Sequence, residues 1–312
     1  YGRVTRFIDG IHTRDVTDDT RMEHLLIKAI VAKKGRVTAK DLADTWLKVP
    51  INLDHFWFDT RASFWKIRSG KLPKLAGGDN VITGSGLMFI SPVGIINAGD
   101  PVQAALDAQN IACIQQPTLG VECASVIAAA VAEAMKADAT LDSVIKCAID
   151  ISSDMPIYPE RGTLFSKETV GGAIEKAVNI ARKYPDVFEV REPLFKECLG
   201  YGAIDPVEVS ALTFAMVQAS GGDVEKAIIG GANIGRDSDT ISRLGGSICG
   251  TLRGIDAVPK DMLAEIEKAI EQKMAVPYID KPLSEIAEDL FLAVTEHLKR
   301  LETNVAQIRK LL

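Results

Sequence analysis

Apolar side chains recur every three or four residues along most of this chain, the spacing that places them on one face of an α-helix. The alternation of apolar and polar positions that indicates a β-strand is nearly absent. The apolar pattern predicts helices over 21–33, 38–49, 100–110, 121–135, 140–151, 167–183, 205–219, 223–229, 241–252, 259–274 and 284–312. We therefore predict an all-α fold, a compact orthogonal helical bundle of ten or more helices. No fixed repeat or linker divides the chain, so we expect residues 1–312 to form a single domain.

Several of the predicted helices begin with a recognisable start signal. An Asp-Pro pair occurs at Asp100 and again at Asp205, and it combines a capping carboxylate with proline at the first helical position. Thr38, with Asp41 three residues further on, resembles a capping box. These signals define where the helices begin more sharply than the apolar pattern alone.

Two of the predicted helices differ from the others in how their apolar residues are distributed. Segment 121–135 is apolar on most faces, so we expect it at the centre of the bundle. Segment 284–312 is long and amphipathic, with Leu290, Val294 and Leu298 along one face. That face can pack on the body of the protein or on a partner, and an oligomer formed through this C-terminal helix is one expectation.

Two segments carry no clear helical pattern. The first is rich in aromatic residues: Phe56, Trp57, Phe58, Phe64 and Trp65. These rings could line a pocket that stacks a planar ligand, but we favour a place in the core. The second segment, 77–86, is rich in glycine, and we predict that it is not helical. We expect the acids of the helices, such as Glu208 and Glu225, to form a solvated face.

Composition limits the class of protein. The chain has 312 residues, of which 47% are hydrophobic and 25% charged, which is typical of a soluble globular protein. The net charge is −6 and no block of Lys and Arg occurs, so nucleic acid is not expected as a partner. The most apolar stretch, 121–135, is too short for a bilayer and carries two glutamates, so we expect no membrane segment.

The five cysteines and the first residue bear on where the protein works. The cysteines are scattered without metal-ligand spacing, which is typical of buried thiols in a reducing compartment, and we expect a cytoplasmic protein. The chain begins at Tyr1 and not at methionine, so we expect that an upstream N-terminal segment is missing.

Two acidic clusters are the strongest chemical signal in the sequence. Thr17, Asp18 and Asp19 precede one predicted helix, and Asp237, Asp239 and Thr240 precede another, after a glycine-rich stretch. Aspartate often caps helices, which is the structural explanation for either cluster alone. Two clusters of hard oxygen donors together favour a site for Mg²⁺ or Mn²⁺. The glycine loop of Gly84, Ser85 and Gly86 could present backbone N–H groups to a phosphate or a sugar.

Three segments taken together resemble a known family, the ADP-ribosylglycohydrolases, which include enzymes like the dinitrogenase reductase-activating glycohydrolase. The segments are 17–22 (TDDTRM), 84–101 and 233–241 (NIGRDSDTI), and they occur in the order that the family shows. The resemblance implies an all-α fold with a two-magnesium centre in a cleft. It also implies hydrolysis of an N- or O-glycosidic bond to ribose, commonly in ADP-ribosylated protein or a related ADP-ribose compound.

Carried over by position, the resemblance assigns roles to the acidic clusters. Thr17, Asp18 and Asp19 would be metal ligands from one side, and Asp237, Asp239 and Thr240 would be ligands from the other. Asp18 and Asp19 are the candidates for acid and base catalysis. The loop formed by Gly84, Ser85 and Gly86 would face the ribose or the diphosphate.

The sequence departs from the family pattern around the sugar pocket and not at the metal ligands. Arg236 stands where the family commonly has glycine, Phe89 where it has arginine, and Thr118-Leu119 where a Thr-His pair is common. Two alternatives to an ADP-ribosylglycohydrolase therefore stay open. One is a hydrolase of free nucleosides or other small glycosides, and the other is a metal-binding homologue without catalysis.

Overall fold

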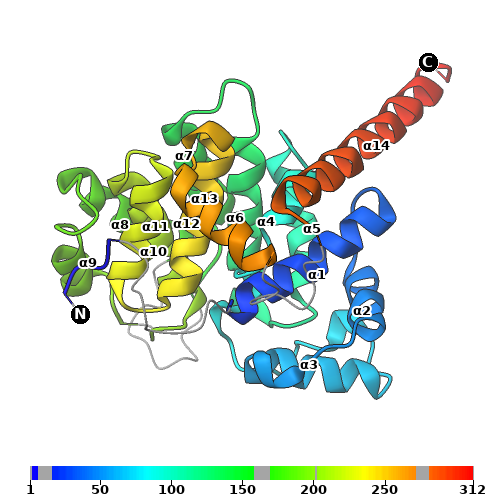
Figure 1. Ribbon diagram of the computed structural model, residues 1–312, viewed down its shortest axis with the longest axis horizontal. Coiled ribbons are helices and arrows are strands. Elements are labelled where there is room, and N and C mark those ends of the chain that lie inside the picture. Colours follow the sequence, from blue (N-terminus) through cyan, green and yellow to red (C-terminus); the bar gives the residue numbers. More distant parts are fainter. Residues whose placement is uncertain (1, 6–15, 158–168, 201, 272–280, 312) are drawn as a thin grey trace.

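The computed structural model describes residues 2–5, 16–157, 169–200, 202–271 and 281–311, and this part of the chain forms helices and no strand (Figure 1). The first half contains α1 (Asp18–Lys33), α2 (Ala39–Lys48), α3 (Phe58–Arg68), α4 (Ser91–Ile96), α5 (Pro101–Ala112), α6 (Thr118–Ala134) and α7 (Leu141–Ser152). The second half contains α8 (Val170–Lys183), α9 (Arg191–Glu197), α10 (Pro206–Ala219), α11 (Val224–Ile234), α12 (Ser238–Arg253), α13 (Lys260–Glu271) and α14 (Leu283–Arg309). The predicted all-α bundle of ten or more helices is confirmed.

Each helix predicted from the apolar pattern is present, with small differences at the ends. Helix α11 continues to Ile234, five residues beyond the predicted end. Positions 167–168, 272–274 and 312 of the predicted helices lie outside the described residues. Helices α3, α4 and α9 were not predicted. The reasons are physical: α4 and α9 are very short, and α3 leaves large apolar side chains exposed to solvent.

The predicted start signals cap their helices. The Asp100 carboxylate accepts a hydrogen bond from the backbone N–H of Gln103 at 3.0 Å, and the Asp205 carboxylate accepts one from Val207 at 2.9 Å. Thr38 and Asp41 form the reciprocal bonds of a capping box at the start of α2. These bonds satisfy backbone donors that have no partner inside the helix.

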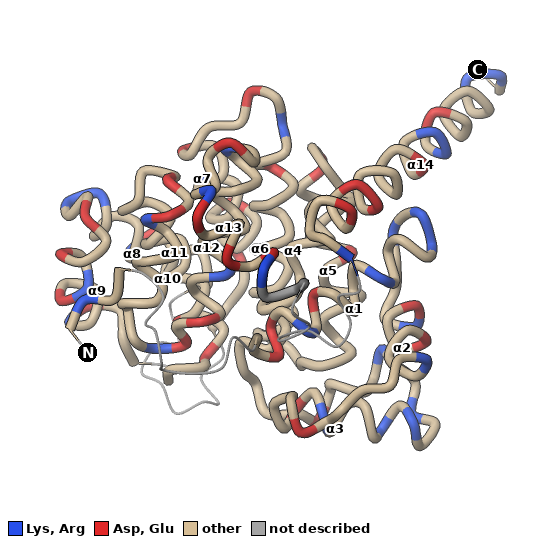
Figure 2. The backbone as a smooth tube through the Cα atoms, in the orientation of Figure 1, with Lys and Arg blue, Asp and Glu red and all other residues tan. Residues whose placement is uncertain are grey.

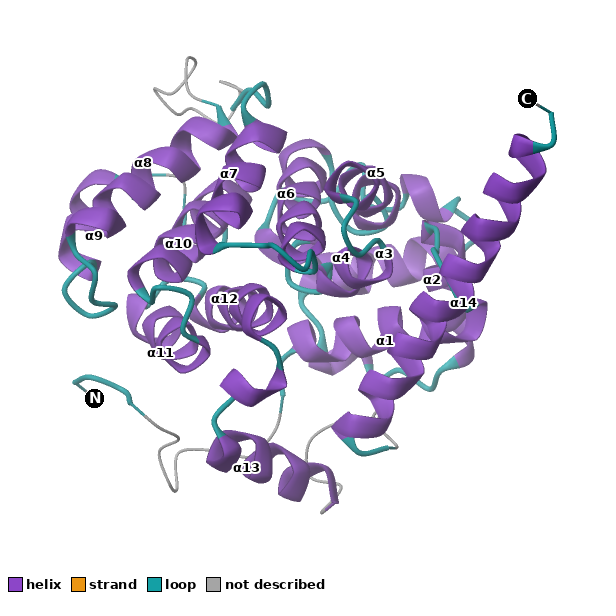
Figure 3. Cartoon of the chain, turned by 90° about the horizontal axis from the view of Figure 1, so that it is seen from above, coloured by secondary structure: helices purple, strands orange, loops and turns teal. Residues whose placement is uncertain are grey.

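Helix α6 runs through the middle of the bundle (Figure 3). All of its residues from Cys123 to Ala132 are buried, and it packs against α4, α5, α7, α10 and α12. Its apolar character on most faces is therefore explained by neighbours on most sides, as predicted. Among the described helices, none has both the length and the apolar character needed to cross a membrane.

Two expectations about buried and exposed side chains were wrong. The aromatic cluster is only partly core: Phe56 and Phe64 are buried, whereas Trp57 is 50% exposed and Trp65 is 53% exposed. Glu208 was expected on a solvated face, but it is fully buried and accepts a hydrogen bond from Arg236 Nε. The reason is that α10, which carries Glu208, is buried on nearly all sides.

A close helix crossing holds α4 against the central helix. A Cβ atom added to Gly94 of α4 would lie 2.5 Å from Val131 Cβ and 2.6 Å from the carbonyl oxygen of Ala128, both in α6. Such distances are too short for any side chain, so glycine is required for this approach. Helix α4 directly follows the glycine-rich turn of residues 84–86, and the crossing therefore helps to position that turn.

We predict that Gly94→Ala destabilises the protein by about 1–3 kcal/mol, because the added methyl group overpacks the α4–α6 crossing. Gly250→Ala in α12 is the matched control, since a Cβ there meets nothing within 4 Å and alanine favours helix. The control should be neutral or slightly stabilising. Urea denaturation of both variants checks this, and equal midpoints for the two would contradict it.

Candidate active site

The first acidic cluster lies in the first turn of α1. Thr17 is the N-cap residue, although its side chain makes no capping bond, and Asp18 and Asp19 follow in the helix. Acidic side chains are favoured here by the partial positive charge of the helix N-terminus. The Thr17 hydroxyl donates to Asp19 Oδ2 at 3.1 Å, and Asp18 Oδ2 accepts from the backbone N–H of Trp57 at 2.9 Å. Both carboxylates are thus held in place.

The second acidic cluster lies where α11 turns into α12. Gly235 ends α11 in the left-handed conformation with φ of 75°, and Asp237 is the N-cap residue of α12. Asp239 and Thr240 lie in the first turn of α12. Because Asp237 precedes the regular helix, its side chain can turn to the same side as that of Asp239, which residues two apart inside a helix do not do.

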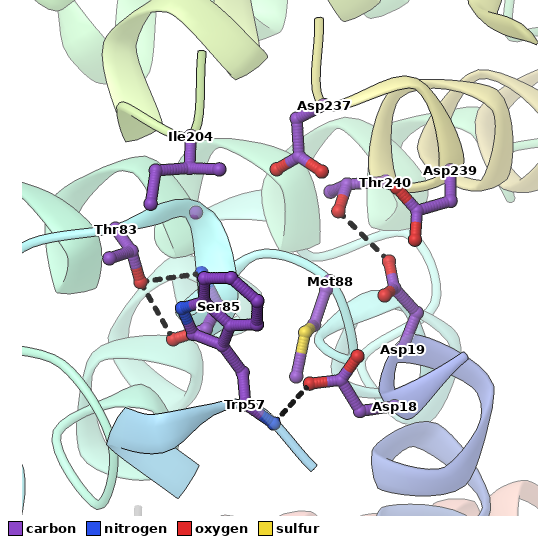
Figure 4. A pocket seen from close by; sticks show the side chains of 11 residues that line it. Asp18, Asp19, Trp57, Thr83, Ser85, Met88, Ile204, Asp237, Asp239 and Thr240 are labelled. Atoms are coloured by element: carbon purple, nitrogen blue, oxygen red, sulfur yellow. Dashed lines mark hydrogen bonds between the residues drawn. The ribbon is translucent and has the colours of Figure 1, made fainter. Parts of the chain in front are cut away.

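The two clusters meet in one pocket (Figure 4). The Thr240 hydroxyl donates to Asp19 Oδ1 at 2.9 Å and joins the two helix starts directly. The pocket has a volume of about 170 Å³. Its lining residues are Asp18, Asp19, Trp57, Thr83, Gly84, Ser85, Met88, Ile204, Asp237, Asp239 and Thr240. One wall is therefore acidic and the other is formed largely by Trp57, Met88 and Ile204.

The pocket is lined by several carboxylates, and its lining has no cationic side chain to balance them. Burial, followed by the charge of Asp239, raises the pKa of Asp19 to about 7. The same two causes raise the pKa of Asp237 to about 8, and burial also raises the pKa of Asp18. No Lys or Arg is among the lining residues. The site therefore favours a proton or an external cation.

The glycine-rich turn forms the neighbouring wall of the pocket. Gly84–Gly86 is a single 3₁₀ turn, so the prediction that this segment is not helical was wrong at this turn. The backbone N–H of Gly84 donates to the carbonyl of Ile204 at 2.7 Å, and a Cβ at Gly84 would lie 3.2 Å from Asp237 Oδ2. Glycine here leaves room for the Asp237 carboxylate. The turn and the second acidic cluster are therefore in direct contact.

Two of the predicted site residues do not line the pocket. Gly86 faces away from it, because a Cβ there would lie 3.1 Å from Gln116 Cγ and 3.1 Å from the Gly120 carbonyl oxygen. Thr17 is exposed and reaches the site only through its hydrogen bond to Asp19. The structure thus brings together Asp18, Asp19, Asp237, Asp239 and Thr240, with Gly84 and Ser85 beside them.

A buried carboxylate that sequence reasoning missed supports the glycine turn from behind. Asp59 of α3 is fully buried and accepts hydrogen bonds from Thr83 Oγ1 at 2.8 Å, Ser85 Oγ at 2.5 Å and Gln116 Nε2 at 2.8 Å. These bonds tie the turn to α3 and to the segment before α6. In the sequence, the available signal was a single acid within an aromatic-rich segment, which does not reveal its partners.

The donor set of the pocket suits a hard cation by its chemistry. Carboxylate and hydroxyl oxygens are the ligands that Mg²⁺ and Mn²⁺ prefer. Within the described residues, no group of three or more His, Cys, Asp or Glu side chains is arranged to hold an ion by itself. An ion here would therefore take one or two carboxylates, with Thr240, water or substrate completing its coordination, as is usual for Mg²⁺.

Comparison with known proteins finds a matching family and a similar protein. The sequence profile of the family described as ADP-ribosylglycohydrolase matches residues 1–299. A protein of Escherichia coli (strain K12), described as uncharacterized protein YegU, is 26% identical over 288 residues, which covers 86% of this chain and 83% of that protein.

A solved structure supports the fold independently. It is titled ADP-ribosylglycohydrolase-related protein complex, and it matches with a TM-score of 0.58 at 19% identity, over 90% of this chain and 80% of that chain. This likeness concerns the fold alone. The profile match spans nearly the whole sequence, including both acidic clusters, and we conclude from it that the chain belongs to the ADP-ribosylglycohydrolase family, a family of hydrolases.

Proposed function

We propose that this protein is a magnesium-dependent glycosidase that hydrolyses the bond between a ribose and its N- or O-linked substituent, with ADP-ribosyl-protein or a related ADP-ribose compound as substrate. The observation that carries the proposal is the meeting of two acidic helix starts, one near each end of the chain, in a single pocket. Family membership supports the reaction class.

We infer that Asp18, Asp19, Asp237, Asp239 and Thr240 hold two Mg²⁺ ions, or Mn²⁺ in their place, with Thr17 supporting Asp19. When bound, the ions would supply positive charge opposite these carboxylates and lower the pKa of a bound water. Buried carboxylates that repel one another are stabilised by such a charge. The raised pKa values of Asp19 and Asp237 in the metal-free chain are in keeping with this role.

The protein side of the mechanism follows from the positions of the pocket residues. The acidic wall can accept hydrogen bonds from the ribose hydroxyls, and Asp18 or Asp19 can take a proton from the attacking water. Asp18 is held by the Trp57 backbone and Asp19 by Thr17 and Thr240, so each has a defined orientation. Negative charge beside the anomeric carbon stabilises the oxocarbenium character that develops during glycoside cleavage.

The apolar wall selects a substrate with a flat face. Trp57 is 50% exposed although it lines the pocket, so a large part of its indole ring is open to a ligand. Figure 4 shows the Trp57 side chain in front of the glycine turn, across the pocket from Asp237. A sugar bound with its hydroxyls toward the acids would place its apolar face or an aromatic substituent against this ring.

A hydrolase of small glycosides is the second candidate, and the size and charge of the pocket favour it. A volume of about 170 Å³ is below the usual range for drug-sized ligands and accommodates the ribosyl part of a substrate. No cationic side chain lines the pocket to receive a diphosphate. Mass spectrometry of ADP-ribosylated peptides and free ribosides, incubated with Mg²⁺ or with EDTA, separates the candidates. If no ribose-containing product were released from either the peptides or the free ribosides, the protein would be a binding protein.

We predict that Asp237→Asn weakens Mg²⁺ binding by about tenfold or more, because it removes one negative donor from the pocket while keeping its size. Asp54→Asn is the control, since the Asp54 side chain is 89% exposed and lies outside the pocket. Isothermal titration calorimetry with MgCl₂ measures both. Unchanged Mg²⁺ affinity in Asp237→Asn would contradict the assignment of this residue.

We also predict a pH dependence in EDTA-treated protein. The folded-state pKa values of Asp19, about 7, and Asp237, about 8, lie above the ordinary value of 3.8. The folded state therefore binds these protons more tightly than the unfolded state does, so this contribution to stability falls as pH rises from about 4 to 8. Thermal melting of wild type and Asp237→Asn should show the variant gaining relative stability over this range. Excess Mg²⁺ should cancel the gain, and a gap independent of pH would contradict the prediction.

Trp57 offers a direct optical test of the apolar wall. Titration with ADP-ribose in the presence of Mg²⁺ should change the tryptophan fluorescence, and Trp57→Phe should remove most of that change while altering affinity by less than about threefold. Trp65→Phe is the matched control, because Trp65 is 53% exposed but does not line the pocket. A full signal in Trp57→Phe, or its loss in Trp65→Phe, would contradict this placement.

A further inference from the structure

Helix α14 is long, and its outer half is exposed, with Arg300 beside Gly35 near the point where this half begins. Its first half packs on α1 and α4 and buries Leu290 and Ala293. Every residue from 298 to 311 is exposed. Figure 1 shows this half of the helix projecting away from the body. A helical segment of this length is only marginally stable in water without tertiary packing, so a partner is expected on it.

An apolar stripe runs along this helix beside the face that meets the body. Its members are Phe291, Val294, Leu298, Leu301, Val305 and Ile308. They follow one another at intervals of three and four residues, which is the heptad spacing of a two-helix coiled coil. Val294 is partly buried, whereas the other five are between 44% and 68% exposed. The stripe is thus ready to receive another helix.

The charges of α14 indicate which helix fits. Acidic residues dominate its first half: Glu285, Glu288, Asp289 and Glu296. Basic residues dominate the second half and the residue after it, with Glu302 as an exception: Lys299, Arg300, Arg309 and Lys310. Figure 2 shows acidic segments where α14 meets the body and basic ones at its free end. In an antiparallel second copy the acidic start of one helix therefore lies beside Arg309 and Lys310 of the other, whereas a parallel copy sets like charges together at both ends; Lys299 and Arg300 lie near the middle in either case.

We propose that this chain forms a two-fold symmetric dimer through an antiparallel coiled coil of the two α14 helices. In the register that pairs the whole stripe, Phe291 lies against Ile308 of the second copy, Leu298 against Leu301, and Val294 against Val305. The same register sets Glu288 at the flank of the seam opposite Arg309 of the second copy, twice by symmetry. This proposal is independent of the chemistry assigned to the pocket.

Sedimentation equilibrium of the whole protein tests the stripe. Wild type should dimerise at micromolar concentrations, and Leu301→Glu should weaken the dimer by at least about thirtyfold, because it places a charge in the seam. Thr303→Glu is the matched control, since it adds the same charge on the opposite, solvent-facing side of the helix. Circular dichroism and thermal melting confirm that both variants fold. A wild type that stays monomeric up to about 100 μM overturns the proposal and leaves the stripe to another protein.

A charge exchange tests the orientation. Arg309→Glu should weaken the dimer by about fivefold, because it opposes Glu288 of the second copy in both symmetric positions. Adding Glu288→Arg to that variant should restore the dimer. A parallel pair does not bring these two positions together, so failure of the double variant to recover overturns the antiparallel register. If Leu301→Glu and Thr303→Glu weaken the dimer to the same extent, the stripe is not the interface.

Discussion

The rest of the site depends on one constraint, which is that carboxylates from two distant helix starts are held together in a partly buried space. The hydrogen bond from Thr240 to Asp19, at 2.9 Å, is the direct link between the two starts. Burial and the repulsion between acids both work against this meeting, and in that order they raise the pKa values of Asp19 and Asp237. What offsets it is the packing of the helices behind them: α12 packs on α6 and α10, and α1 packs on α2, α4 and α14. The bundle therefore holds the charges in place, and a cation bound there would stabilise the fold as well as serve catalysis.

Local signals in the sequence were enough for the longer helices and for the meeting of the acidic clusters, but not for α3, α4 and α9 or for the surroundings of the site. The Asp-Pro starts and the apolar spacing act over a few residues, so α5, α6 and α10 could be predicted from their own sequence. The clusters could be paired because each combines two Asp residues with a Thr at the start of a helix and because both resemble segments of one family. The place of Trp57 could not be predicted, because an aromatic residue suits a core and a pocket wall equally well. Glu208 has the sequence of a surface acid, but it lies on a helix that is buried on nearly all sides and pairs there with Arg236 from the turn between α11 and α12.

Asp59 shows why support for a site is harder to predict than the site itself. Its three side-chain partners, Thr83, Ser85 and Gln116, come from two later segments of the chain, and each of them makes further bonds within the same network. No short spacing relates these residues, so the network exists only once the helices are packed. Its consequence is nonetheless local. The Ser85 hydroxyl donates to Asp59, and the backbone N–H groups of Gly84 and Ser85 donate to the Ile204 carbonyl and to Thr83 Oγ1, so these donors of the turn already have partners within the protein.

Helix α1 connects the pocket to the outer surface of the molecule. Its first turn carries Asp18 and Asp19, and two residues beyond its end at Lys33 lies Gly35, where a Cβ would lie 2.5 Å from Arg300 Nη2 of α14. A helix of 16 residues is about 24 Å long, so these two ends are separated by roughly three Debye lengths at physiological ionic strength. The Arg300 charge at this end of α1 is therefore largely screened from the acidic pocket. Contacts made at this end of α14 can change with little direct electrostatic effect on the site, and coupling between the two ends would have to pass through movement of α1 itself.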